Sequence, residues 1–195
     1  MLKQRVTHEA MKLFSVKGYT STSTTDIIQA AKTSKGGFYN HFKSKEQLFN
    51  EVLSEARLIW RERNLYQLER AARPLAKVQK LLENYRDRYL SDTDNFPGGC
   101  LFVNLAVELN DQNPELAKRL NQGFVRLQAM IQRFLDEDKA QGGIAAEVDS
   151  AAAASLIMSG ILGACVMHSA GKSTQQLDTT IAALIAYLNS LAVPQ

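Results

Sequence analysis

The chain has 195 residues, 45% of them hydrophobic and 22% charged, and a formal net charge of +3. This composition predicts a soluble globular protein with a sizeable core and excludes a disordered or collagen-like chain. The two cysteines, Cys100 and Cys165, are too few for a disulfide scaffold. Glycine and proline are sparse, and the stretches between them are rich in strong helix formers, so we expect an all-α fold.

Positive charge is concentrated in residues 1–50. This segment holds 8 Lys and Arg against 3 Asp and Glu, a balance of +5, whereas residues 51–195 hold 15 against 17, a balance of −2. Such asymmetry is typical of a polyanion-binding module joined to a near-neutral body. A basic surface that is merely solvated gives the same counts, so the charge leaves both interpretations open.

Two helices are predicted first in the chain. Apolar residues at helical spacing indicate a helix over residues 2–17, and Gly18 is its stop signal. After a polar loop, Thr24 is expected to cap a short helix over 25–31. Asp26 would then lie in the first turn, where the helix dipole favours an acidic side chain.

A third short helix is expected over about 34–42, after a tight turn. Two short helices joined by a turn and braced by another form a helix-turn-helix unit, whose second helix enters the major groove of DNA. Gly36 and Gly37 each cost about 1 kcal/mol in a helix relative to Ala, but they allow a close approach of the backbone to another surface. Phe38 and Phe42 share one buried face. The other faces carry Lys35, Tyr39, Asn40 and His41.

These four side chains suit phosphate oxygens and base edges. The alternative is a small capped helix whose polar residues only meet water.

The remaining chain is predicted to form a connecting helix and a bundle of about five helices. Ser44 and Gln47 fit a capping box at the start of the connecting helix. That helix is expected to reach residues 68–73, until Pro74 interrupts it. Later helices are expected at about 75–91, 100–111, 114–140, 147–170 and 174–192. We therefore expect a DNA-binding domain over 1–46 and a ligand-binding and dimerisation domain over 47–195.

Residues 1–50 resemble the DNA-binding domain of TetR-family transcriptional regulators, most densely from Ser34 to Leu48. The family usually has Gly then Val in the turn where this chain has Lys32 and Thr33. Because Lys pays about 1 kcal/mol or more for a left-handed backbone, we expect this turn to be strained or reshaped. The resemblance is carried by Phe14, Gly18, Tyr19, Thr24, Thr25, Ile28, Ala31, Ser34, Lys35, Gly36, Phe38, Tyr39, His41, Phe42, Ser44, Lys45, Glu46, Gln47 and Leu48.

The resemblance implies a set of residues that contact double-stranded DNA. Hydroxyl groups and a helix N-terminus would meet one phosphate, and other side chains would meet further phosphates or base edges. Asn40 is a candidate base reader, and its alternative is an exposed spectator. The full set is Thr24, Thr25, Lys35, Gly36, Gly37, Tyr39, Asn40, His41 and Lys45.

The resemblance also implies a homodimer on a palindromic operator, with its two recognition helices about 34–36 Å apart. Repression is the commoner mode in the family, with release by a small molecule. A dimer interface is expected in the last two helices, and the alternative for its residues is the core of the chain. The candidates are Ser159, Gly163, Ile181, Leu184 and Leu188.

Aromatic and apolar residues in the second half are candidate linings of an effector site, although each also suits an ordinary core. Cys100 follows Pro97-Gly98-Gly99 at a helix start, which lowers a thiol pKa. The pattern from Leu101 to Glu108 resembles an electrophile- and oxidant-responsive subgroup, so Cys100 is a candidate sensor; the alternative is a small packed residue. Cys165 is expected to be inert core. The candidates are Trp60, Tyr85, Tyr89, Cys100, Phe102, Phe124, Met158 and His168.

Other classes fit the sequence less well. We expect no enzyme, catalytic residue, cofactor or metal, because the three histidines lack ligand spacing and no nucleotide-binding motif occurs. The N-terminus is no secretory signal, and the uncharged run 151–167 is short for a membrane span, so we expect a cytoplasmic protein without a membrane partner. The alternative function is a helical small-molecule-binding or adaptor protein that no longer binds DNA.

Overall fold

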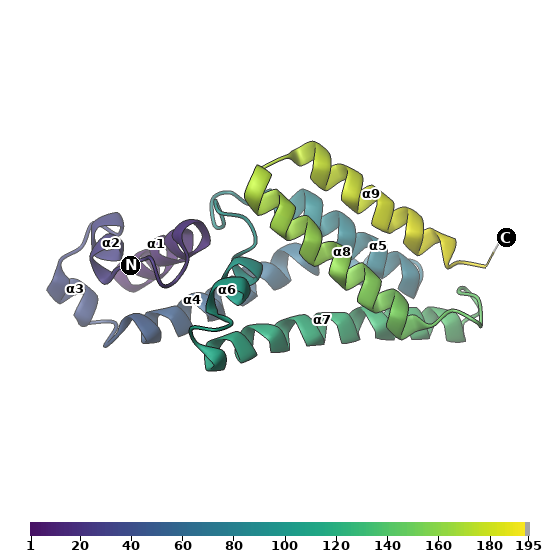
Figure 1. Cartoon of the computed structure of the whole chain (residues 1–195), viewed down its shortest axis with the longest axis horizontal. Coiled ribbons are helices and arrows are strands. Elements are labelled where there is room, and N and C mark those ends of the chain that lie inside the picture. The colour runs from purple at the N-terminus through teal and green to yellow at the C-terminus, as the bar shows by residue number, and fades with distance from the viewer. Residues whose placement is uncertain (194–195) are drawn as a thin grey trace.

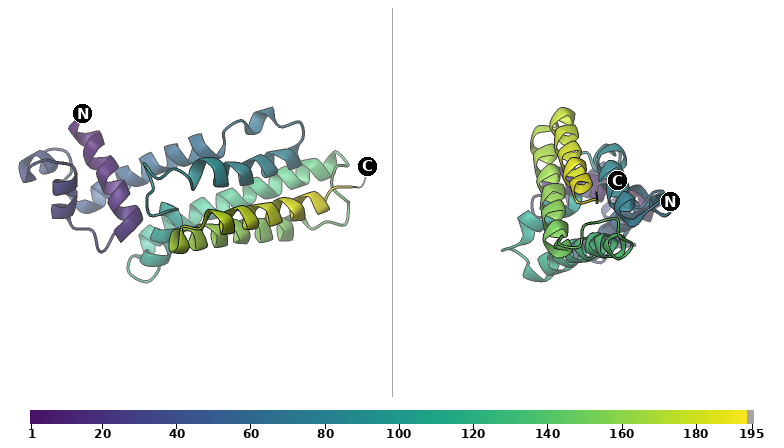
Figure 2. Two further views of the ribbon diagram at one scale, coloured as in Figure 1. Left: turned by 90° about the horizontal axis from the view of Figure 1, so that it is seen from above. Right: turned by 90° about the vertical axis from the view of Figure 1, so that its right-hand side faces the viewer.

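The computed structural model describes residues 1–193, which are mainly helical and contain no β-strand, as the all-α prediction required. The first three helices form a unit at one end, and the remaining helices extend away from it as a bundle (Figures 1 and 2). The helices are α1 (Leu2–Lys17), α2 (Thr24–Ala30), α3 (Lys35–Tyr39), α4 (Lys45–Asn64), α5 (Pro74–Asn84), α6 (Leu101–Leu109), α7 (Pro114–Ala140), α8 (Ser150–Gly171) and α9 (Thr174–Ser190).

The N-terminal unit has its own aromatic core. Phe14 of α1 and Phe38 of α3 are fully buried, as are Ile27 of α2 and Phe42 just after α3. Phe49, on the first turns of α4, packs against Phe14 with ring centroids 5.8 Å apart. The connecting helix therefore contributes to this core, and the orientation of α3 is determined by packing from behind.

The caps of the short helices differ in detail from the predictions. Ser23, not Thr24, caps α2: its hydroxyl accepts the Asp26 N–H, and the Asp26 carboxylate accepts the Ser23 N–H, which completes a capping box. At the start of α4, Ser44 Oγ accepts the Gln47 N–H at 3.1 Å. The Gln47 side chain accepts from the Lys43 N–H and not from the Ser44 N–H, so only one of the two predicted hydrogen bonds of this capping box forms.

The connecting helix ends at Asn64, several residues before the predicted end. Asn64 is fully buried, and its side-chain amide donates to the Trp60 carbonyl. The Asn84 amide donates to the carbonyls of Asn64 and Tyr66, so these helix-end acceptors are paired from α5. A left-handed Gln67 and a 3₁₀ turn, η1 (Leu68–Arg70), then lead into α5.

Helices α5, α7, α8 and α9 build the core of the bundle, and a π-helical turn, η2 (Tyr85–Tyr89), continues α5. Within residues 1–193, α8 is the one helix that is long and apolar enough for a membrane span by length and composition. Here it packs against both α7 and α9, with Ala154, Ile157 and Ile161 buried. One face of α8 is therefore part of the core, and the opposite face is exposed.

Candidate nucleic-acid interface and effector cavity

Helix α3 presents a polar face to solvent at the far end of the molecule from the bundle (Figure 1). Ser34 caps it, accepting the Gly37 N–H at 3.0 Å. Phe38 and Phe42 are fully buried behind it. The exposed residues of this segment are Lys35, Gly36, Tyr39, Asn40 and His41.

The two glycines of α3 stand in different surroundings. A Cβ on Gly37 would lie 2.5 Å from Thr33 Oγ1, so packing inside the chain already favours a glycine there, because any other residue would displace the Thr33 side chain. A Cβ on Gly36 would meet only Ser34 Oγ, at 3.9 Å, which is ordinary contact. The fold of this chain therefore does not explain Gly36, although glycine weakens a helix by about 1 kcal/mol relative to Ala. A glycine at this position is explained if the backbone of α3 must closely approach another molecule.

The turn between α2 and α3 is left-handed at Lys32, with φ 45°. The sequence predicted this strain, because lysine replaces the glycine that accepts such a backbone freely. Hydrogen bonds close the turn from both sides: the Lys32 N–H donates to Gln29 O and the Thr33 N–H to Ile28 O. The Lys32 side chain is exposed beside α3.

The other predicted contacts lie beside α3. Thr25 is exposed and Thr24 half-buried at the start of α2. Lys45 is half-buried: its Nζ lies 4.3 Å from the Tyr19 ring centroid and 3.5 Å from Thr20 O. Burial lowers the pKa of Lys45, against the attraction of Glu108 and Asp26, which raises it. A phosphate at Lys45 would compete with these internal contacts.

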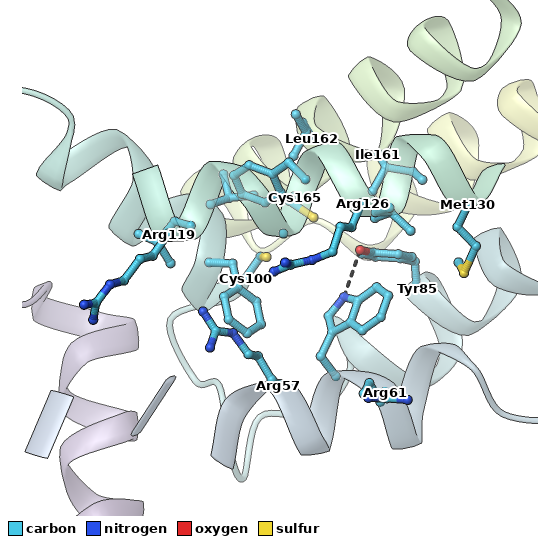
Figure 3. A pocket seen from close by; sticks show the side chains of 17 residues that line it. Arg57, Arg61, Tyr85, Cys100, Arg119, Arg126, Met130, Ile161, Leu162 and Cys165 are labelled. Atoms are coloured by element: carbon cyan, nitrogen blue, oxygen red, sulfur yellow. Dashed lines mark hydrogen bonds between the residues drawn. The ribbon is translucent and has the colours of Figure 1, made fainter. Parts of the chain in front are cut away.

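A cavity of about 370 Å³ opens between α4, α6, α7 and α8, within the usual size range of small-molecule sites (Figure 3). Five of the eight predicted effector residues line it: Trp60, Tyr85, Cys100, Phe102 and Phe124. The Tyr85 hydroxyl accepts the indole N–H of Trp60 at 2.9 Å. Burial raises the pKa of Tyr85 well above its ordinary value.

Three predicted effector residues do not line this cavity. Tyr89 is buried behind it, with its hydroxyl 3.5 Å from Cys100 Sγ. Met158 is buried elsewhere on α8, and His168 lies in the last turn of that helix. Position along α8 explains the last two, because Met158 and His168 lie about one turn before and one turn after Ile161, Leu162 and Cys165, the residues that face the cavity.

Sequence reasoning missed two features of the cavity. Cys165, expected to be inert core, is buried but lines the cavity beside Cys100. Four arginines also line it: Arg57 and Arg61 of α4, and Arg119 and Arg126 of α7. The sequence could have predicted this, because Arg57 and Arg61 are spaced i, i+4 and Arg119 and Arg126 are spaced i, i+7, so each pair shares one helix face.

Cys100 caps the N-terminus of α6 and is almost fully buried. Its pKa is lowered to about 7: the neighbouring Cys165 thiol is the largest cause, opposed by burial and supported by Tyr89 and by the Val103 and Phe102 N–H groups. The pKa of Cys165 is raised well above its ordinary value by Cys100 and by burial. Cys100 is therefore the more acidic thiol of the pair.

The opposite end of α6 contacts the N-terminal unit. The Glu108 carboxylate accepts the N–H groups of Tyr19 and Thr20, at 2.8 and 2.6 Å. A Cβ on Gly18, which has φ 80°, would overlap this carboxylate. In the loop before α6, the Gly98 N–H donates to Ser15 Oγ at 3.1 Å. One short helix thus joins the cavity to the end of α1.

The outer faces of α8 and α9 carry small and apolar residues. Ser159 and Gly163 are exposed, and a Cβ on Gly163 would meet nothing within 4 Å. The predicted interface residues Ile181, Leu184 and Leu188 are instead buried in the chain, so that expectation is corrected. Leu184 packs closely against α8 because Gly160 leaves room for its side chain, where a Cβ would lie 2.5 Å from Leu184 Cδ2. The exposed set is Ala152, Ser155, Leu156, Ser159, Gly163, Val166, Met167, Ala182, Ala183 and Ala186.

The comparisons with known proteins agree with this geometry. Residues 6–52 match the model of bacterial regulatory proteins of the tetR family, and residues 74–184 match that of the tetracyclin repressor-like C-terminal domain. The HTH-type transcriptional repressor DhaR of Mycobacterium sp. is 27% identical over 91% of this chain and 87% of its own.

Two solved structures share the whole fold. A TetR transcriptional regulator from Chloroflexus aurantiacus is 30% identical, with a TM-score of 0.89 over 98% of this chain and 96% of its own. A cysteine mutant of the TetR-family regulator CifR, solved with 26-bp operator DNA, is 22% identical, with a TM-score of 0.81 over 94% of this chain and 95% of its own.

Proposed function

The chain belongs to the TetR family of DNA-binding transcriptional regulators, and on that premise we propose that it represses transcription as a homodimer on a palindromic operator. The observation that carries the proposal is the exposed face of α3, with Gly36 open to an outside surface. Residues 1–46 serve as the DNA-binding domain and residues 47–195 as the effector-binding and dimerisation domain. The protein then works where the chromosome is, in the cytoplasm or nucleoid.

On the DNA, each group takes the contact that its chemistry suits. Lys35 and the Gly36 backbone approach base edges in the major groove, with Gly37 keeping the first turn narrow. Thr24, Thr25, Tyr39, His41 and Lys45 donate to phosphates. Asn40 reads a base or remains a spectator. His41 needs no charge for this contact, since a neutral imidazole donates one N–H.

The dimer forms through the exposed faces of α8 and α9, with Ser159 and Gly163 allowing close helix approach. Exposed apolar residues such as Leu156 and Val166 support this, because a contiguous apolar face on a soluble chain marks an interface. A single three-helix unit buries little surface on DNA, so two copies are needed for specific affinity.

The effector binds in the cavity, and α6 transmits its binding to the DNA-binding domain. Cys100 at the start of α6 borders the cavity, while Glu108 near its end holds the loop after α1. An effector that binds better when α6 is displaced favours a dimer whose recognition helices no longer match the operator. Modification of Cys100 by an electrophile acts on the same helix.

Fluorescence anisotropy tests the proposal with DNA from upstream of the protein's own gene and a shuffled duplex of equal length. We expect salt-dependent binding that prefers the upstream fragment at least a hundredfold, with two chains per operator. Lys35→Ala should reduce the preference, because Lys35 approaches base edges, whereas Tyr39→Ala and Lys45→Ala should weaken binding to both duplexes. Failure to distinguish the two duplexes would favour a ligand-binding protein that no longer reads DNA.

A further inference from the structure

Arg57, Arg119 and Arg126 form an uncompensated positive cluster on the wall of the effector cavity. Arg57 lies on α4, and the other two lie on α7. Within residues 1–193, none of the three pairs with a carboxylate, whereas arginines such as Arg63 and Arg73 do. Arg119 donates to the Asn50 side-chain oxygen at 3.0 Å, which leaves its charge unneutralised.

Arg57 is repelled by the charges of the other two guanidinium groups. Burial lowers the pKa of Arg57, and the charges of Arg126 and Arg119 lower it further. In Figure 3, Arg57 extends from α4 and Arg126 from α7 toward the same region beside Cys100, while Arg61 points away from them. All three residues are exposed, so water screens part of this repulsion, and an anion bound in the cavity would relieve what remains.

The rest of the cavity is apolar and aromatic. Trp60, Phe102, Phe124, Leu127, Met130 and Ile161 supply most of the wall. The Tyr85 hydroxyl accepts a hydrogen bond from Trp60, and among residues 1–193 it donates its own proton to no acceptor. It can therefore donate one hydrogen bond to a polar atom of a bound molecule.

We propose that the cavity binds a small amphipathic anion, with an apolar or aromatic body against Trp60 and Phe102 and one acidic head group between Arg57 and Arg126. Guanidinium groups bind carboxylates and phosphates through paired, charge-assisted hydrogen bonds, so either head group would satisfy the cluster. The inference rests on the proposed function only in taking this cavity as the effector site. It specifies the charge of the effector, which the proposed function leaves open.

The site carries its own probe, because Trp60 is the single tryptophan of the chain. The full-length protein is titrated, without DNA, with four compounds that share one body: 4-phenylbutyrate, 4-phenylbutyl phosphate, 4-phenylbutyramide and 4-phenylbutylamine. We expect saturable changes in Trp60 fluorescence with one or both anions, and at least tenfold weaker binding of the amide and the amine. The stronger anion identifies the head group as carboxylate or phosphate.

Variants assign the selectivity to the arginines. Arg57→Gln and Arg126→Gln should each weaken anion binding at least tenfold and leave amide binding unchanged. The matched control is Arg133→Gln, an exposed arginine on α7 outside the cavity. Equal affinity for anion and amide, tighter binding of the amine, no response to either anion at millimolar concentration, or insensitivity of anion binding to both variants would overturn the inference.

Operator binding is measured separately on the same preparations, so the two proposals fail independently. Loss of anion selectivity with intact operator binding counts against the ligand class alone. Absence of operator binding with intact anion selectivity counts against the repressor, and the ligand class stands.

Discussion

The carboxylate of Glu108 accepts the backbone N–H of Tyr19 at 2.8 Å, and so ties the end of α6 to the loop that follows α1. The same carboxylate accepts from Thr20. Because α6 begins at the cavity with Cys100, displacement of this helix moves a contact of the DNA-binding unit directly.

Glu108→Ala should uncouple the effector from the operator. It removes both hydrogen bonds, at a cost of about 1–3 kcal/mol in the free energy of unfolding. We expect operator affinity without effector to change less than the response to effector, which should fall severalfold. Operator titrations with and without effector measure both quantities. Glu55→Ala, on the exposed side of α4, is the control, and a full response in Glu108→Ala would contradict this route.

Gly36→Ala should separate DNA binding from folding. The new Cβ fits the free chain, since only Ser34 Oγ lies within 4 Å, and alanine favours the helix by about 1 kcal/mol. We therefore expect an unchanged or higher melting temperature but at least a tenfold loss of operator affinity, because the methyl group separates α3 from the bases.

Gly171→Ala is the matched control for Gly36→Ala. It adds a methyl group to another helical glycine that has open space around it, at the end of α8 and outside the cavity. The control should keep operator affinity. Wild-type affinity in Gly36→Ala would remove the observation that carries the proposed function.

Cys100 should react with N-ethylmaleimide more readily than Cys165, with a rate that rises through about pH 7. The thiolate is the nucleophile, and the pKa of Cys100 is lowered to about 7 whereas that of Cys165 is raised. Mass spectrometry of peptides from protein labelled between pH 5.5 and 9 measures both rates.

Two variants test the origin and the consequence of that reactivity. Cys165→Ala removes the largest cause of the lowered pKa, so the pH profile of Cys100 should move upward. Cys100→Ser should protect operator binding from the reagent. If wild type and Cys100→Ser lose the operator equally, Cys100 is a packing residue and no sensor.

Asp138 should stabilise the bundle at neutral pH and not in acid. It is 1% exposed and accepts hydrogen bonds from Arg73 and from the Leu75 N–H at the start of α5. Burial raises its pKa, but these hydrogen bonds and the Arg73 charge lower it by more, so the folded-state pKa lies below the ordinary value. The stabilisation is therefore complete above the unfolded pKa of about 3.9 and is lost as pH falls through the folded pKa.

Asp138→Asn should then lower the free energy of unfolding by about 2–3 kcal/mol at pH 7, and by progressively less below about pH 4. Urea denaturation across this pH range measures the difference from wild type. Asp136→Asn, on the exposed face of α7, should have little effect at any pH. A pH-independent difference for Asp138→Asn would show that packing rather than charge is responsible.

Much of the N-terminal unit was predictable because its determinants are local. Phe38 and Phe42 are four residues apart, Ser44 stands before Gln47, and Lys32 occupies a turn that needs a left-handed residue. Each feature depends on residues only a few positions apart, whose contacts are set by the local geometry of a helix or turn. Where two local signals competed, as with Ser23 and Thr24, the cap was set by which residue Asp26 could reach.

The sequence by itself thus determined that this chain is all-helical and carries an exposed recognition helix, since caps, turns and helix faces depend on neighbours within a few residues. Only the tertiary structure decided which residues line the cavity, where α4 ends, and that Leu184 faces inward. Those outcomes depend on Arg57 and Arg126 lining one cavity, on the hydrogen bond from Asn84 to Asn64 and on the packing of Leu184 against Gly160, relations between helices far apart in the chain. Such contacts form only once packing has fixed which helix faces which.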